Sequence, residues 1–391
     1  MSEPLFDASL VPAEVARATG ERAWVEAMLE VEVALVAVQA ELGLAPSSAA
    51  EAIAHAAESL HLDPAVLGEE AGLTGTPADP LVRALRSAAG DKAVARWVHH
   101  GATSQDIVDS AAMLVARRAL AHIEPALAAT ADCCAELAER YRETPMLART
   151  LLQPALPTTF GLVAARWLVS IDDAGERLHA VSAQRLTVQL GGPAGTLAAL
   201  GGDGPAVAAG VARRLGLTEP ILPWHTLRGP VHALAGALDE ALGAVGKVAL
   251  DVVLLSQAEV GEVAESSDNG RGGSSSLPHK HNPIGSALAL GGVRRAHAAA
   301  SLLTGTMLQE LERSATGAWH SEWAPLSEAL ALTGGVATTM TRVLDGLQVC
   351  PERMSENLAR SGVPELDVAL DPATNLAAAS TLVDRALERR R

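Results

Sequence analysis

Residues 266–283 carry the side chains with the clearest capacity for chemistry. They read Ser-Ser-Asp-Asn-Gly-Arg-Gly-Gly-Ser-Ser-Ser-Leu-Pro-His-Lys-His-Asn-Pro. Glycines let backbone N–H groups turn towards an anion, serines add hydroxyl donors, and Lys280 adds a charge that can bind a carboxylate or stabilise an enolate beside one. A Gly/Ser run alone is typical of a linker, but the Pro-His-Lys-His-Asn-Pro end departs from linker composition. Because the spacing does not match a phosphate-binding loop, we interpret the segment as a candidate site for carboxylate chemistry.

Residues 99–109 form a second candidate segment, His-His-Gly-Ala-Thr-Ser-Gln-Asp-Ile-Val-Asp. Thr103, Ser104 and Asp106 are typical of residues that cap the start of a helix. Capping alone explains them, but hydroxyls and free N–H groups at a helix start also form an anion site. His99 and His100 either face that site or hydrogen-bond within the loop.

A third segment, residues 148–161, holds polar residues within an apolar stretch. Arg149, Thr150 and Gln153 need an explanation, because polar side chains are mostly exposed. Two prolines before a helical pattern predict a structured loop that leads into a helix. A fourth segment, 309–323, contains Gln-Glu-Leu-Glu-Arg-Ser and Trp-His-Ser-Glu-Trp. Packing explains its tryptophans, and the role of its histidine stays open.

The composition predicts that helices position these segments. Hydrophobic residues make up 49% of the 391 residues but aromatic residues only 2%, which favours Ala/Leu-rich helices over β structure. Apolar residues recur at steps of three and four, and they predict long helices over 24–42, 120–141, 242–259 and 326–347. No comparable set of alternating strands is present. Several of these helices are apolar on more than one face, which predicts burial against other subunits.

Charge and cysteine content exclude several classes of protein. The 30 Lys+Arg against 46 Asp+Glu give a net charge of −16, which argues against nucleic-acid binding but allows local binding of small anions. The longest uncharged stretch, 186–202, is too short and Gly-rich to span a membrane, and the N-terminus lacks secretory features. Cys133, Cys134 and Cys350 lack zinc-like spacing. We therefore expect a cytoplasmic protein without metal, membrane or nucleic-acid partners.

Together, these segments resemble the fumarase/aspartase superfamily. Its loop pattern G-S-S-x-M-P-x-K-x-N stands here at 273–282, with Leu277 in place of the usual Met. Two further segments of the superfamily appear in the expected order, as Gly-Ala-Thr-Ser-Gln-Asp at 101–106 and Arg-Thr-Leu-Leu-Gln-Pro-Ala at 149–155. The resemblance covers almost the whole chain. Within the superfamily it is closest to the bacterial 3-carboxy-cis,cis-muconate cycloisomerases.

Three features favour that branch over the related fumarases and lyases. The lyases carry a His after the Arg-Thr pair, where this chain has Leu151, and usually a Glu five residues after the loop Asn, where it has Ala287. Segment 309–323 also resembles the corresponding segment of the cycloisomerases. Two positions depart from the cycloisomerases, because His281 stands where they usually carry Arg, and Leu151 where they often carry Trp.

The resemblance implies an all-α, three-part helical subunit that assembles as a homotetramer around a long central bundle. The expected parts are an N-terminal helical domain at 1–105, a central bundle domain at 106–345 that carries the loop 266–283, and a C-terminal helical domain at 346–391. Relatives place a helical stretch between the landmarks matched here by Met354 and Leu370, so the third domain is expected to be shortened. Active sites of the superfamily draw segments from three subunits.

The implied reaction closes a lactone, as one carboxylate of a tricarboxylate muconate adds across a double bond. Its difficulty is a carbanion-like centre beside a carboxylate, which needs a proton donor and positive electrostatic support. By resemblance, Ser274 transfers the proton, and Lys280 lowers the pKa of its hydroxyl and holds the adjacent carboxylate with Asn282. No cofactor is expected. The remaining substrate-binding candidates are Thr103, Ser104, Thr150, Gln153, Ser275 and His100.

Two other functions stay open. One is an adenylosuccinate-lyase-like enzyme or another lyase that releases fumarate by β-elimination. The other is a helical scaffold that has lost the chemistry. The scaffold is disfavoured, because an inactive relative would be free to lose Ser274, Lys280 and Asn282, and this chain retains all three.

Overall fold

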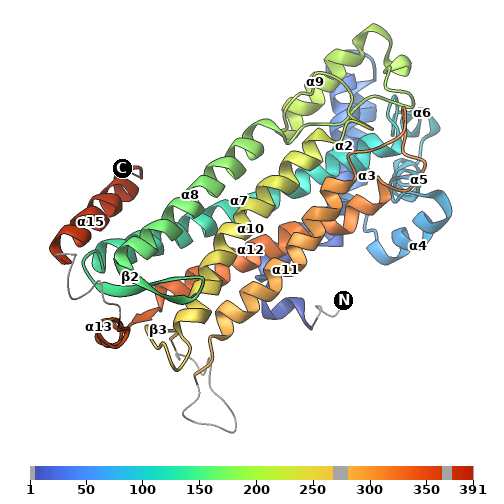
Figure 1. Ribbon diagram of the computed structural model, residues 1–391. Helices are drawn as coiled ribbons and strands as arrows, with labels where there is room; N and C mark the ends of the chain where they lie inside the picture. Colours follow the sequence, from blue (N-terminus) through green and yellow to red (C-terminus); the bar gives the residue numbers. More distant parts are fainter. Residues whose placement is uncertain (1–4, 267–280, 363–371, 391) are drawn as a thin grey trace.

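The computed structural model describes residues 5–266, 281–362 and 372–390, and helices dominate it (Figure 1). Five long helices run side by side as a bundle, and each packs against at least two of the others. They are α7 (Ser104–Arg140), α8 (Phe160–Gln184), α10 (Gly229–Leu255), α11 (Ile284–Gly305) and α12 (Trp323–Asp345). Buried Ala, Val and Leu side chains fill the space between them. The predicted all-α fold with a long central bundle is confirmed.

Small residues let these helices approach closely. A Cβ atom added at Gly246 of α10 would lie 3.1 Å from Cγ1 of Val293 in α11, and one added at Gly334 of α12 would lie 3.3 Å from Cγ1 of Ile123 in α7. Neither contact leaves room for a larger side chain without displacing a neighbour. The abundance of Ala and Gly and the scarcity of aromatic residues therefore follow from the close packing of the bundle.

Shorter helices precede the bundle and enclose a second, smaller core. Val36, Ile53, Leu85 and Val98 are buried there. The elements of this region are η1 (Asp7–Ser9), α1 (Ala13–Thr19), α2 (Glu21–Glu41), α3 (Ser47–Ser59), α4 (Pro64–Thr74), α5 (Ala78–Ala89) and α6 (Lys92–Ala95). Because α2 packs against both α3 and α7, it joins this core to the bundle.

Short strands and helices complete the described part of the chain. They are β1 (Pro145–Thr150), β2 (Gln153–Thr159), η2 (Ala198–Asp203), α9 (Gly204–Leu215), β3 (Val263–Ala264), η4 (His320–Glu322), β4 (Gln348–Val349), α13 (Pro351–Arg360) and α15 (Pro372–Glu388). β3 pairs with β4 in an antiparallel arrangement. After α12, the described residues form only β4 and two helices, which agrees with a shortened C-terminal part.

The four helix predictions are confirmed, but α7 begins at Ser104 and α10 at Gly229, well before the predicted starts at 120 and 242. α2 and α7 cover the predicted helices at 24–42 and 120–141 apart from one C-terminal residue each, whereas the third and fourth end at Leu255 and Asp345, before the predicted ends. The predicted loop at 148–161 is wrong. β1 and β2 form an antiparallel hairpin there, which leads directly into α8. The prolines of β2 argued against a strand in the sequence. An edge strand tolerates proline, because one side of it has no neighbouring strand to which a backbone N–H must donate.

The bundle separates the candidate segments. α7 has 37 residues, so it spans about 55 Å at roughly 1.5 Å per residue. Thr103 and Ser104 lie where α7 begins, and the β1–β2 hairpin follows the opposite end of that helix (Figure 1). Among the described residues, no helix is long and apolar enough to cross a lipid bilayer.

Candidate active site

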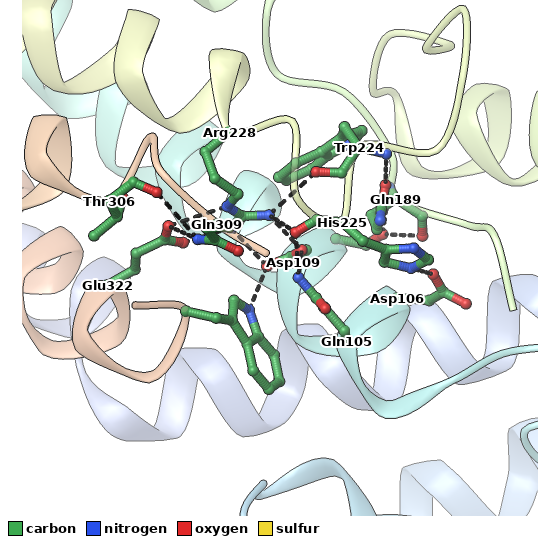
Figure 2. A network of polar contacts seen from close by, with 12 residues as sticks. Gln105, Asp106, Asp109, Gln189, Trp224, His225, Arg228, Thr306, Gln309 and Glu322 are labelled. Atoms are coloured by element: carbon green, nitrogen blue, oxygen red, sulfur yellow. Dashed lines mark hydrogen bonds and ion pairs between the residues drawn. The ribbon is translucent and has the colours of Figure 1, made fainter. Parts of the chain in front are cut away.

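Asp106, in the first turn of α7, joins three loops. Figure 2 shows its contact with His225. Its buried carboxylate accepts hydrogen bonds from the backbone N–H groups of Thr103 at 2.9 Å, Gly191 at 3.0 Å and Gly192 at 2.9 Å. His225 places Nε2 2.6 Å from the same carboxylate. A carboxylate also suits the positive end of the helix dipole. The predicted helix start at 103–104 is therefore confirmed, and tertiary contacts fix its geometry.

Asp109, one turn further along α7, anchors a second buried network (Figure 2). Arg228 donates to both of its carboxylate oxygens, at 2.8 and 3.0 Å, and Trp319 donates to it at 2.9 Å. Arg228 also donates from Nε to Glu322 at 3.0 Å, so one buried guanidinium bridges two buried carboxylates. Burial raises the pKa of Glu322, although Arg228 opposes that shift.

Arg313 approaches the start of α7 from segment 309–323. Its guanidinium donates to the backbone oxygen of Gly192 at 2.8 Å and to Oε1 of Gln105 at 3.3 Å. Burial lowers its pKa, against the attraction of Asp106. The cation is therefore held beside the loop that Asp106 organises. Sequence reasoning singled out this segment but gave Arg313 no role.

In the loop before α7, the buried carboxylate of Glu32 orients the side chain of His99. His99 has a left-handed backbone, with φ of 63°. Its backbone N–H donates to Glu32 at 2.9 Å, and its Nδ1 lies 2.6 Å from the other oxygen of that carboxylate. The ring of His100, the histidine predicted to bind substrate, packs edge-on against Trp97, with the ring centroids 5.0 Å apart. Since an unfavourable φ persists only where surroundings hold it, His99 is the better-oriented member of the pair.

His99 is expected to make folding stability depend on pH. Burial alone lowers its pKa from the usual 6.5, but the hydrogen bond and charge of Glu32 outweigh burial, so the pKa is raised. The folded state then binds more protons than the unfolded state, so protonated His99 stabilises the fold. This stabilisation is complete below pH 6.5 and is lost as the pH rises through the raised pKa of His99 in the folded state. The free energy of unfolding should therefore fall between these two pH values in the wild type but not in His99→Asn, where asparagine tolerates the positive φ.

The measurement is urea unfolding at a fixed protein concentration across this pH range. His55→Asn is the control, because His55 lies exposed on α3. It should keep the wild-type pH slope. A slope in His99→Asn equal to that of the wild type would contradict the assignment.

The β1–β2 hairpin presents two other candidate residues at its tip. Thr150 and Gln153 form its last pair, and the turn between them consists of Leu151 and Leu152, which have φ values of 50° and 62°. Leu151 is 97% exposed and Leu152 65% exposed. Two leucines with positive φ and open apolar side chains are costly in an isolated subunit, because water contacts both side chains and the backbone is strained.

One loop candidate, Asn282, lies at the same end of the bundle as the hairpin. Asn282 stands two residues before α11, and the start of that helix is capped by Glu265, which accepts from the N–H groups of Gly285 at 2.9 Å and Ser286 at 2.8 Å. Ser274, Ser275 and Lys280 lie outside the described residues.

One chain thus gathers the candidates into two separate groups. Thr103, Ser104 and His100 lie at the start of α7, whereas Thr150, Gln153 and Asn282 lie at the far end of the bundle. Charged residues that were not among the predicted catalytic or substrate-binding residues hold the first group in place. At the start of α7 these are Glu32, Asp106, Asp109, His225, Arg228, Arg313 and Glu322. For Glu32, Asp106 and Asp109 the signal was a charged residue within a helix rich in apolar residues, which implies a buried partner.

No metal centre is found in residues 5–266, 281–362 and 372–390, because no cluster of three or more His, Cys, Asp or Glu side chains there could hold an ion. The donors at both groups are hydroxyls, amides, guanidinium groups and backbone N–H groups. Such donors suit a substrate with several carboxylates.

Comparison with known proteins gives consistent matches. The model of a family described as "Lyase" matches residues 13–297. The chain is 44% identical to the nitrosuccinate lyase of Streptomyces davaonensis, over 95% of this chain and 81% of that protein. It is 40% identical to the 3-carboxy-cis,cis-muconate cycloisomerase of Pseudomonas aeruginosa, over 99% of this chain and 86% of that protein.

Solved structures agree with these matches. The cycloisomerase structure from Acinetobacter calcoaceticus superposes with a TM-score of 0.86 at 34% identity, over 99% of this chain and 88% of that one. The lactonizing enzyme from Pseudomonas putida superposes with a TM-score of 0.88 at 35% identity, over 100% of this chain and 89% of that one.

Proposed function

The chain belongs to the lyase family of the fumarase/aspartase superfamily, and from this premise we propose that it is a 3-carboxy-cis,cis-muconate cycloisomerase acting in protocatechuate degradation. The superfamily membership makes it an enzyme of the lyase and cycloisomerase class. One observation supports the choice of this reaction above all others. Cycloisomerases from several bacteria match the chain at 38–41% identity over 88–99% of its length.

The proposed reaction is an internal addition. One carboxylate oxygen of the muconate forms a C–O bond to a carbon of a double bond, and the neighbouring carbon gains a proton. The electron pair of the double bond becomes the new C–H bond, so atoms and charge balance without an external oxidant or reductant. Positive groups are needed where negative charge develops on the carboxylate beside the reacting carbon.

We assign the proton transfer to Ser274 and the adjacent carboxylate to Lys280, Ser275 and Asn282. The other substrate oxygens would meet Thr103 and Ser104 at the start of α7, and Thr150 and Gln153 at the hairpin tip. His99, held by Glu32, joins His100 as a candidate in that first group. The rigid anchoring of α7 by Asp106 supports this assignment, because a fixed donor set aligns a substrate without reorganisation.

A complete site in this proposal needs more than one copy of the chain. α7 is about 55 Å long at roughly 1.5 Å per residue, with the first group of candidates at its start and the hairpin after its other end. Association of copies would bring the start of α7 in one subunit to the hairpin or loop of others, and would cover the exposed side chains of Leu151 and Leu152. We therefore propose a homotetramer in the cytoplasm with shared active sites.

A nitrosuccinate lyase is the second candidate. Its supporting observations are the 44% identity to the Streptomyces davaonensis lyase and the presence of His281 where cycloisomerases usually carry Arg. Fewer fixed positive charges suit a substrate with two carboxylates better than one with three. The elimination would remove a proton from one carbon, break the C–N bond at the next, and release nitrite with fumarate.

Ultraviolet absorbance with purified enzyme separates these functions. We expect the absorbance of 3-carboxy-cis,cis-muconate to fall as its conjugated double bonds are consumed. Nitrosuccinate, adenylosuccinate and argininosuccinate would each instead produce fumarate. Turnover of one of these three, without turnover of the muconate, would overturn the proposed cycloisomerase and leave the lyase class standing.

A further inference from the structure

Arg149, which is half-buried, forms an ion pair that links the hairpin to two other segments. Its two Nη atoms lie 2.9 and 2.7 Å from the two carboxylate oxygens of Glu262, which is completely buried. Asn357 of α13 donates to the same carboxylate at 2.9 Å and to the backbone oxygen of Val260 at 2.8 Å. We call Arg149, Glu262 and Asn357 the Glu262 clamp.

The backbone around Glu262 is itself fixed. Its N–H donates to the oxygen of Leu255 at the end of α10, and its own oxygen accepts from the N–H of Cys350 at 3.0 Å. The next residues form β3, which pairs with β4. The carboxylate is therefore attached to the bundle and to the C-terminal part of the chain, and it is a rigid anchor for anything that binds it.

The hairpin depends on such an anchor. A two-stranded hairpin is only marginally stable by itself, and a register irregularity interrupts β1 between Leu147 and Arg149. Arg149 is the last residue before the tip pair of Thr150 and Gln153. Because successive residues of a strand face opposite sides, holding Arg149 on one side fixes the direction of Thr150 on the other.

Stability alone does not account for a charged pair at this place. Removing two charges from water has a desolvation penalty that often equals the attraction between them. Apolar residues of similar volume commonly stabilise a fold at least as much as such a pair does. What an apolar pair lacks is the geometry of a two-pronged guanidinium–carboxylate contact, which allows one orientation and one register.

We propose that Glu262 is a positioning residue that sets where the hairpin tip, with Thr150 and Gln153, is presented to substrate. The proposal rests on the proposed function only in taking Thr150 and Gln153 as substrate contacts. Glu262 touches no substrate itself. It acts through Arg149, with Asn357 holding its carboxylate in place.

The first test compares Glu262→Gln with Glu356→Gln. Glutamine keeps the size of Glu262 and an oxygen for Asn357, but it removes the charge that Arg149 binds. Glu356→Gln makes the same change in the exposed Arg353–Glu356 pair on α13. Since a displacement of about 1 Å can cost 100-fold in rate, we expect Glu262→Gln to lower kcat/KM by about 10- to 100-fold, and Glu356→Gln to leave it unchanged.

The double variant R149M/E262L separates positioning from stability. It removes both charges, so neither ion is left without its partner. Its melting temperature should therefore be closer to that of the wild type than the melting temperature of Glu262→Gln is. Its kcat/KM should stay as low as in Glu262→Gln, because the two-pronged contact is still missing. Recovery of kcat/KM together with the melting temperature would overturn the proposal, as would a Glu262→Gln enzyme within twofold of Glu356→Gln.

Amide hydrogen exchange gives a readout that needs no substrate. Residues 145–159 should exchange faster in Glu262→Gln than in Glu356→Gln, while α7 and α10 should be unchanged. Unchanged exchange in the hairpin would overturn the proposal even if the double variant did not fold. The kinetic arm uses whichever substrate the wild-type enzyme converts, so failure of the muconate assay would reject the proposed function without deciding the role of Glu262.

Discussion

Replacement of Ser274 by alanine is expected to lower kcat by about 100- to 10,000-fold, the usual contribution of a positioned proton donor or acceptor. The variant loses one hydroxyl from a loop rich in other donors, so substrate binding should change much less than turnover. KM should therefore stay within a few-fold of the wild-type value. Steady-state kinetics with the substrate that the wild-type enzyme converts would measure both quantities.

Ser276→Ala is the matched control for that experiment. Ser276 is the third serine of the same run, and it occupies the variable position of the loop pattern. Its removal tests whether any loss of a hydroxyl in this segment reduces turnover. A Ser274→Ala enzyme as active as Ser276→Ala would reject Ser274 as the proton-transfer residue and would direct attention to His99, which Glu32 orients.

Replacement of Arg228 by methionine should give the largest loss of stability. Methionine keeps most of the volume of the side chain but leaves Asp109 and Glu322 buried together without their shared cation. Breaking a buried ion pair from one side costs about 3–5 kcal/mol. Urea unfolding at equal protein concentration would measure the loss. It should shrink as pH is lowered, because protonation neutralises the two carboxylates.

Arg83→Met provides the comparison for Arg228→Met. Arg83 pairs with Glu70 and Asp79, and its side chain is 51% exposed, so the loss should stay within about 1 kcal/mol. Equal losses in the two variants would show that the network at Asp109 contributes no more than a surface pair. The start of α7 would then owe its position to apolar packing alone.

The sequence determined the helical part of this protein because its signal is local. Steps of three and four between apolar residues place one face of a helix against a core wherever the helix later packs, so α2 and α12 were predictable within a few residues. For α7 and α10 the pattern predicted the existence of the helix but not its start, and α11 was not predicted. The chemistry-bearing segments were also evident from residue types alone. Gly, Ser, Lys and Asn in 273–282 match a short sequence pattern, and the residues at 103–104 are types that favour helix starts, so both segments can be recognised without knowledge of distant contacts.

Only the tertiary structure decided which charges meet. Asp109 and Arg228 are 119 residues apart, and Arg228 and Glu322 are 94 apart, so no local pattern pairs them. The same holds for Arg149 with Glu262 and for His99 with Glu32. The hairpin at 145–159 escaped prediction because its prolines oppose strand formation and its stability comes from contacts with distant elements. A buried charge needs its partner, because without one the fold would be destabilised by the full desolvation penalty of that charge. Burial is decided by the packing of the bundle, so these pairs could not be read from the sequence.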